Sequence, residues 1–183
     1  MSADRSTITA TALPADWGTL SVVHNFPSRA VPSRSVYIWV PPTPGPHDVL
    51  LLQDGEKVFR GREERGDSWR VPATMMELHS EDGIKPPLVV GVSATENRAG
   101  EYMPEEAVTG PGEDIFREAH VSRVYIPRSR AYRSFLVDEL MPYLRSTYDV
   151  VNDGPGVTIG GSSRAALFSI YAAVIHPEIF SNG

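Results

Sequence analysis

Two adjacent serines, Ser162 and Ser163, stand in the stretch VTIGGSSRAAL, between an apolar run with two glycines and a run of helix formers. A serine at a sharp turn from a strand into a helix can present its hydroxyl as a nucleophile, provided that its backbone adopts a strained positive φ. The chain folds back tightly there, so the residues two before and two after must be small. Around Ser163 these residues are Gly161 and Ala165. Around Ser162 the second of them is Arg164, which fits a crowded position badly. The pattern therefore predicts Ser163 as the nucleophile.

Acyl transfer also needs hydrogen-bond donors for the oxyanion that forms on the substrate carbonyl. The N–H of Arg164 would point into the site at the N-terminus of the following helix, where the helix dipole favours negative charge. The second donor is expected from the turn after VLLLQDG, where the N–H of Glu56 is best placed. The alternative is that Ser163 only caps the helix after a glycine turn. A phosphate-binding loop is excluded, because the glycine-rich start of GPGVTIGG precedes the strand and no lysine follows the loop.

Three apolar runs can form the strands that position these groups. Residues 49–55 and 87–93 are continuously apolar up to a polar turn, and residues 156–161 repeat the pattern more weakly. Such runs are typical of strands that are buried on both faces of a parallel sheet. Residues 19–26 and 34–42 are short β-rich runs and predict an antiparallel pair.

Helical patterns lie between and after the buried strands. Residues 72–83 and 164–176 predict two helices, and residues 131–148 predict a third that Pro142 should kink unless the backbone adjusts there. Strands that alternate with helices indicate an α/β fold, in which sites form beyond the carboxyl ends of the strands. The polar stretch 95–130 is too long for an ordinary connection and is expected to form part of a substrate-facing surface.

Composition restricts the classes of partner. The net charge of −6 and the pI near 5.3 argue against nucleic acid or an anionic membrane. The chain has no cysteine, which excludes disulfides and thiol catalysis. It shows neither the apolar core of a signal peptide nor a membrane span, so a soluble, cytoplasmic protein is expected. No cofactor is expected. We predict a flexible polar tail over residues 1–17, followed over residues 18–183 by one domain or part of a larger one.

Four segments carry a resemblance to a known family. VLLLQDGEKVF, PLVVGVSATENRAGEYMP, FLVDELMPYLRSTYDV and TIGGSSRAALFSIYAAVIHPEIF occur in the order seen in the putative esterase family, the branch of α/β-hydrolases that contains enterochelin esterases, feruloyl esterases and mycolyltransferases. The chain resembles the enterochelin esterase type most, over residues 35–180. The resemblance implies that Ser163 is the nucleophile and that the amides of Glu56 and Arg164 form the oxyanion hole. Arg98 and Glu101 match a recurrent R-x-x-E segment, which implies either a role in shaping the site or contacting substrate, or a surface ion pair.

The sequence departs from the family pattern at two places. Ala165 and Ala166 stand where the family usually has two glycines. In addition, the triad order of this fold is Ser, then Asp or Glu, then His, whereas this chain ends at Gly183, soon after the nucleophile helix. We therefore expect an α/β-hydrolase-type, mainly parallel sheet flanked by helices and incomplete at its C-terminal side, with residues 18–183 forming the N-terminal two-thirds of the domain.

The positions of the histidines in the sequence place most of them too far from Ser163 to act as its base. One lies ~19 Å beyond Ser163 along the expected helix, at 1.5 Å per residue, and three lie at or before other predicted elements. We expect solvated or helix-terminal roles for these four, which are His24, His47, His79 and His176. Only His120, in the long polar stretch, could approach the site. No two histidines have the spacing of metal ligands, so no metal site is predicted.

Three functions fit these observations. The first is a fragment of a serine esterase that hydrolyses a small-molecule carboxylic ester, of a siderophore or an aromatic acid, through an acyl-Ser163 intermediate, with activity impaired because acid and base segments are missing. The second is a non-catalytic binding or interaction module on the same fold, and the third is an acyltransferase. The last strand of the incomplete sheet would also expose an unpaired edge, which predicts self-association through that edge.

Overall fold

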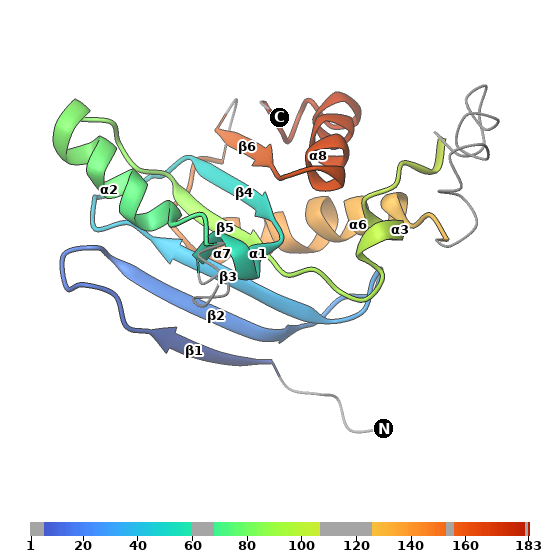
Figure 1. Cartoon of the computed structure of the whole chain (residues 1–183), viewed down its shortest axis with the longest axis horizontal. Coiled ribbons are helices and arrows are strands. Elements are labelled where there is room, and N and C mark those ends of the chain that lie inside the picture. Colours follow the sequence, from blue (N-terminus) through green and yellow to red (C-terminus); the bar gives the residue numbers. More distant parts are fainter. Residues whose placement is uncertain (1–5, 60–67, 107–125, 153–155, 182) are drawn as a thin grey trace.

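The computed structural model describes residues 6–59, 68–106, 126–152, 156–181 and 183. In this part of the chain, a six-stranded sheet has helices packed against both of its faces, which confirms the predicted α/β architecture (Figure 1). The strands are β1 (Thr7–Thr11), β2 (Thr19–Phe26), β3 (Arg34–Val40), β4 (Val49–Gln53), β5 (Leu88–Val92) and β6 (Val157–Gly160). The helices are α1 (Gly55–Phe59), α2 (Val71–Asp82), α3 (Arg98–Glu101), α6 (Ser129–Ser134), η2 (Phe135–Leu140), α7 (Met141–Thr147) and α8 (Arg164–Ile175).

The sheet is mixed, with the strand order β1-β2-β3-β5-β4-β6. Strands β1, β2, β3 and β5 pair antiparallel in succession, while β4 pairs parallel with both β5 and β6. The predicted parallel arrangement therefore holds for the three apolar runs, and the predicted antiparallel pair is formed by β2 and β3. Because β4, β5 and β6 run in the same direction, their carboxyl ends meet at one edge of the sheet (Figure 1).

Strand β1 corrects the prediction of a tail over residues 1–17. Residues 7–11 pair with β2 over the register from Thr7↔His24 to Thr11↔Leu20. Four of the five β1 residues are exposed, and the fifth is half-buried. Backbone pairing therefore holds this strand, aided by the Thr9 hydroxyl, whose Oγ1 lies 2.8 Å from Nε2 of His24. A hydrophobic pattern cannot reveal such a strand, because it has almost no buried side chains.

Alternate side chains of the central strands enter two separate clusters. Leu88, Val90 and Val92 of β5 pack in the larger cluster, under α6, η2, α7 and α8, whereas Val89 packs in the smaller cluster beside α1 and α2. All five residues of β5 are buried, as predicted for a strand covered on both faces. The larger cluster joins the helix that follows β6 to the rest of the core through Phe168, whose ring lies 5.1 Å from that of Tyr132.

The helix predicted around Pro142 is continuous, because its backbone adjusts. Helices α6, η2 and α7 follow one another without a break from residue 129 to residue 147, and η2 is a π-helical segment. The N–H of Met141 donates to the carbonyl of Leu136, five residues earlier. In a regular α-helix the ring of Pro142 would collide with the carbonyl of Asp138, four residues before it. The wider π turn gives that ring room.

Candidate active site

Ser163 lies at the turn between β6 and α8, with φ of 61° and ψ of −123°. These values are in a strained region for a residue with a side chain, and they match the positive φ that the sequence pattern demands. The small flanking residues are needed: a Cβ atom added to Gly161 would lie 2.6 Å from the Cβ of Ala165. The side chain of Ser163 is exposed, so the turn holds its hydroxyl out from the sheet.

Ser163 is the N-cap residue of α8 by position, as in the alternative, but it does not cap the helix with its side chain. Its backbone carbonyl accepts hydrogen bonds from the N–H groups of Ala166 and Leu167, at 3.0 and 3.2 Å. Its side chain makes no capping hydrogen bond. The hydroxyl is therefore left to other chemistry, at the end of α8 where the helix dipole is positive. Arg164 is the first residue of α8, so its amide belongs to that same positive end.

The turn from Asp54 to Glu56 leaves the sheet beside the Ser163 turn. Strands β4 and β6 pair up to Leu52↔Gly160, so the two segments that follow them start next to each other. The Asp54–Glu56 turn is tight, because the carbonyl of Asp54 accepts a hydrogen bond of 2.8 Å from the N–H of Lys57. The amide of Glu56 lies in the first turn of α1, where a helix leaves its N–H groups without intrahelical partners.

Close packing and an unusual backbone conformation define this second turn. Asp54 has a φ of 57°. Gly55 approaches β5 so closely that an added Cβ would lie 2.4 Å from the carbonyl carbon of Gly91. The carboxylate of Glu56 accepts a hydrogen bond of 3.2 Å from the N–H of Ala94, beyond the end of β5. The turn is thus fixed against the neighbouring strand at the edge where sites form in such sheets.

Arg98 and Glu101 do not form the surface ion pair that was one of the two expectations. Nε and Nη2 of Arg98 donate to Oδ1 and Oδ2 of Asp54, each at 2.6 Å. Glu101 instead accepts hydrogen bonds from Nη2 and Nη1 of Arg34, at 2.7 and 3.0 Å. The second pair is buried, with 1% of each side chain exposed. One residue of the R-x-x-E segment therefore reaches the Asp54–Glu56 turn, and the other reaches β3.

The charges of both arginines are stabilised by these contacts. The hydrogen bonds to Asp54 raise the pKa of Arg98. Burial alone would lower the pKa of Arg34, but its hydrogen bonds with Glu101 and nearby negative charge outweigh burial and raise it. Sequence reasoning missed Asp54 and Arg34. Asp54 had a signal, since it stands in the QDG turn directly before Glu56, whereas nothing in the local sequence marks Arg34.

The four histidines of the described residues have contacts outside the two turns. Nδ1 of His79 lies 2.9 Å from the carbonyl oxygen of Ile84 at the end of α2, and Nδ1 of His176 lies 2.8 Å from the carboxylate of Glu178 after α8. His24 bonds to Thr9 as above. His47 differs from the expected solvated role, because it is buried in the bridge that precedes β4. His120 lies outside the described residues.

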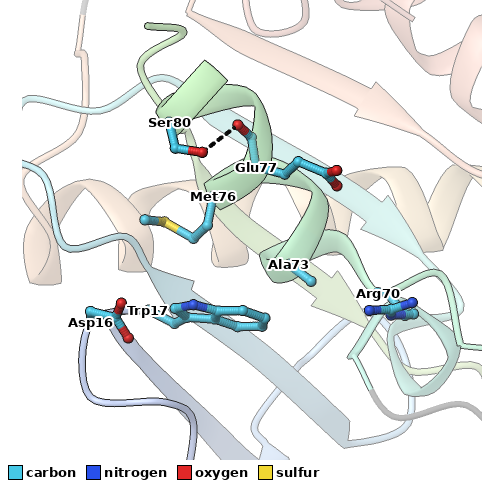
Figure 2. A pocket seen from close by; sticks show the side chains of 7 residues that line it. All are labelled: Asp16, Trp17, Arg70, Ala73, Met76, Glu77 and Ser80. Atoms are coloured by element: carbon cyan, nitrogen blue, oxygen red, sulfur yellow. Dashed lines mark hydrogen bonds between the residues drawn. The ribbon is translucent and has the colours of Figure 1, made fainter. Parts of the chain in front are cut away.

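Three hollows lined by described residues lie away from Ser163. One, of about 420 Å³, lies between the segment before β2 and helix α2 (Figure 2). Trp17 forms one wall, and Met76 and Ala73 face it from α2. This hollow includes no residue of the two turns. Among the described residues, no group of three or more His, Asp or Glu side chains could hold a metal ion, and no helix is long and apolar enough to cross a membrane.

Comparisons of the sequence and of the fold with known proteins agree on esterases. Residues 32–182 match the model of a family described as Putative esterase. The chain is 24% identical over 170 residues to an uncharacterized protein, YjcH, of Bacillus subtilis (strain 168), covering 90% of this chain and 60% of that protein. Its fold resembles the enterochelin esterase of Shigella flexneri, with a TM-score of 0.65 and 17% identity, over 94% of this chain and 36% of that one. It also resembles a ferulic acid esterase of Anaeromyces mucronatus, with a TM-score of 0.57 and 15% identity, over 97% of this chain and 57% of that one. The chain therefore spans between about a third and three-fifths of the length of these proteins.

Proposed function

Since the chain belongs to the Putative esterase family, we propose that it is a serine carboxylic-ester hydrolase in which the hydroxyl of Ser163 attacks the ester carbonyl. The observation that carries the proposal is the backbone of Ser163, with φ of 61° and ψ of −123° at the junction of a buried strand and a helix. A strained residue needs a reason to persist, and no side-chain capping hydrogen bond supplies one here. The exposed hydroxyl next to a helix N-terminus supports nucleophilic chemistry.

The chemistry follows from the two neighbouring turns. Oγ of Ser163 forms a bond to the carbonyl carbon, and the carbonyl oxygen becomes an oxyanion that the N–H groups of Glu56 and Arg164 stabilise. The tetrahedral intermediate collapses, the C–O bond to the alcohol breaks, and the alcohol leaves with a proton. Water then attacks the acyl-serine, the acid departs, and the hydroxyl of Ser163 is restored.

A general base must accept the serine proton during the first step. The four described histidines make their contacts elsewhere, and the hydroxyl of Ser163 has no hydrogen-bonding partner among the described residues. We therefore assign the base to a group outside the described residues, where His120 is the first residue to test. The substrate is assigned to an ester of a siderophore or of an aromatic acid, in line with the enterochelin esterase and the ferulic acid esterase among the similar folds.

The test is covalent labelling with a fluorophosphonate, which phosphonylates activated serines. The natural protein, at the full length that its gene encodes, should be labelled at Ser163, as identified by peptide mass spectrometry. Ser163→Ala should abolish labelling, while Ser162→Ala, the matched control on the adjacent serine, should retain it. Labelling that depends on Ser162, or labelling that survives Ser163→Ala, would show that the nucleophile is assigned wrongly.

Loss of the base should slow ester turnover strongly. Without a base beside Ser163, an oxyanion hole and substrate binding leave an acceleration of roughly 10³–10⁴ over water. If His120 is the base, His120→Ala should therefore reduce the hydrolysis of a nitrophenyl ester to about that level. Turnover that survives His120→Ala but not Ser163→Ala would assign the base to another residue.

A further inference from the structure

We propose that Arg98 is a positioning residue for the Asp54–Glu56 turn, and that it acts through its ion pair with Asp54. The inference rests on the proposed function, because it concerns the amide of Glu56 as an oxyanion donor. In this role Arg98 does not contact the substrate.

The Asp54–Glu56 turn is held by its own backbone on one side and by β5 on the other. The N–H of Lys57 closes the turn on the carbonyl of Asp54, and Gly55 lies against the backbone of Gly91. None of these contacts involves the side chain of Asp54. Its φ of 57° is uncommon for a residue with a side chain, so a further interaction must hold it there.

The guanidinium of Arg98 supplies that interaction. Two parallel N–H···O bonds of 2.6 Å fix both the position and the plane of the Asp54 carboxylate. The carboxylate is 2% exposed and so depends on protein donors, and the only other side-chain donor to it among the described residues is the hydroxyl of Tyr102, at 3.3 Å. A lysine would provide charge but not the planar fork that sets the orientation.

Helix α3 is itself anchored, and this holds the guanidinium of Arg98 in place. Residues three apart lie on the same side of one helical turn. Here one of them, Glu101, is bound to Arg34 of β3 inside the core, while the other, Arg98, bonds to Asp54. The R-x-x-E spacing thus connects β3 to the Asp54–Glu56 turn through two ion pairs. A displacement of Asp54 would also displace the amide of Glu56, two residues later.

The experiment compares Arg98→Lys, Asp54→Asn and the double variant in the natural protein. Asn keeps the shape of Asp and tolerates the left-handed backbone region, so Asp54→Asn preserves the fold. Arg130→Lys is the matched control, because Arg130 also pairs with carboxylates but is 66% exposed. The readouts are kcat and KM for a nitrophenyl ester, the labelling rate of Ser163 by a fluorophosphonate, and the thermal melting temperature.

We expect kcat and the labelling rate to fall about 10- to 100-fold in each single variant, because an oxyanion donor acts mainly in the transition state. KM should change little, and Arg130→Lys should behave as the unaltered protein. The double variant should be no slower than the slower single variant, since both changes break one ion pair.

The inference fails if Arg98→Lys and Asp54→Asn retain kcat while Ser163→Ala abolishes turnover. It also fails if KM alone rises in Arg98→Lys, because Arg98 would then contact the substrate. It fails as well if the two losses multiply in the double variant, because Arg98 and Asp54 would then act independently. If Ser163→Ala leaves turnover intact, the proposed function fails instead, and with it the premise of the inference.

Discussion

Gly161→Ala tests whether the tight fold-back around Ser163 is required. The added Cβ would lie 2.6 Å from Cβ, 2.9 Å from the carbonyl carbon and 3.1 Å from the carbonyl oxygen of Ala165. Carbon atoms prefer a separation of about 3.5–4.0 Å, so the first turn of α8 must move by about 1 Å. Two of these atoms are backbone and the third is a Cβ, so no change of rotamer can displace any of them.

The cost follows from this movement. Overpacking of a well-packed site costs about 1–3 kcal/mol of the free energy of unfolding. For a domain of this size, that lowers the melting temperature by about 2–4 °C for each kcal/mol. A displacement of about 1 Å at a reacting group can also reduce the rate of its chemistry about 100-fold. Gly161→Ala should therefore lose both stability and the labelling of Ser163.

Gly160→Ala is the matched control, one residue earlier in the chain. Its added Cβ would meet only Cδ2 of Leu52, at 3.1 Å, which is the flexible end of a side chain. The assays are thermal melting, a urea unfolding midpoint and the rate of fluorophosphonate labelling. Adding Ala165→Gly to Gly161→Ala removes the nearest contact and should restore part of both losses. If Gly161→Ala matches the unaltered protein in stability and labelling, the steric reasoning behind the choice of Ser163 is refuted.

Three other predictions concern strain, pH and association. Ser163→Gly should gain about 1–3 kcal/mol of stability by relieving backbone strain, less about 0.4–1 kcal/mol because glycine makes the unfolded chain freer. Ser163→Ala should gain nothing. Equal melting temperatures of the two variants would contradict the strain. Burial raises the pKa of Tyr148 to about 12, so the free energy of unfolding should fall as pH rises from about 10 to 12, where the unfolded chain loses the Tyr148 proton first. Tyr148→Phe should lessen this fall, as measured by urea unfolding midpoints. An unchanged dependence on pH would count against the raised pKa. Ile170 and Val174 are 56% and 71% exposed on α8, and β6 pairs only with β4 among the described strands. Light scattering should therefore detect self-association of the protein, and Val174→Lys should reduce it. A monodisperse protein at all concentrations would rule this out.

The structural features that depend on local sequence could be predicted, and those that depend on distant partners could not. The geometry of Ser163 follows from the sizes of residues two positions away, and the burial of β5 follows from its continuous apolar run. The partners of Arg98 and Glu101 are 44 and 67 residues away in the sequence. No local pattern records which carboxylate or guanidinium the folded sheet brings to them, so their spacing alone left a surface pair as an alternative.

Strand β1 and the π-helical segment escaped prediction for different reasons. The side chains of β1 are exposed or half-buried, so no alternation of buried and exposed residues marked it as a strand. In the helix around Pro142, apolar residues spaced by three and four are compatible with either an α- or a π-turn. The proline indicated that something must change there, but sterics alone do not say whether a helix bends, ends or widens.

The π-helical segment also has a consequence for how this sequence can vary. A wide turn holds one more residue than an α-turn, so deleting one residue between 135 and 140 would convert η2 into regular α-helix without rotating the faces of α6 and α7 against the core. In that shortened helix Pro142 would meet the carbonyl four residues before it. The extra residue and the proline are therefore coupled, and we expect homologous sequences to keep both or to lose both together.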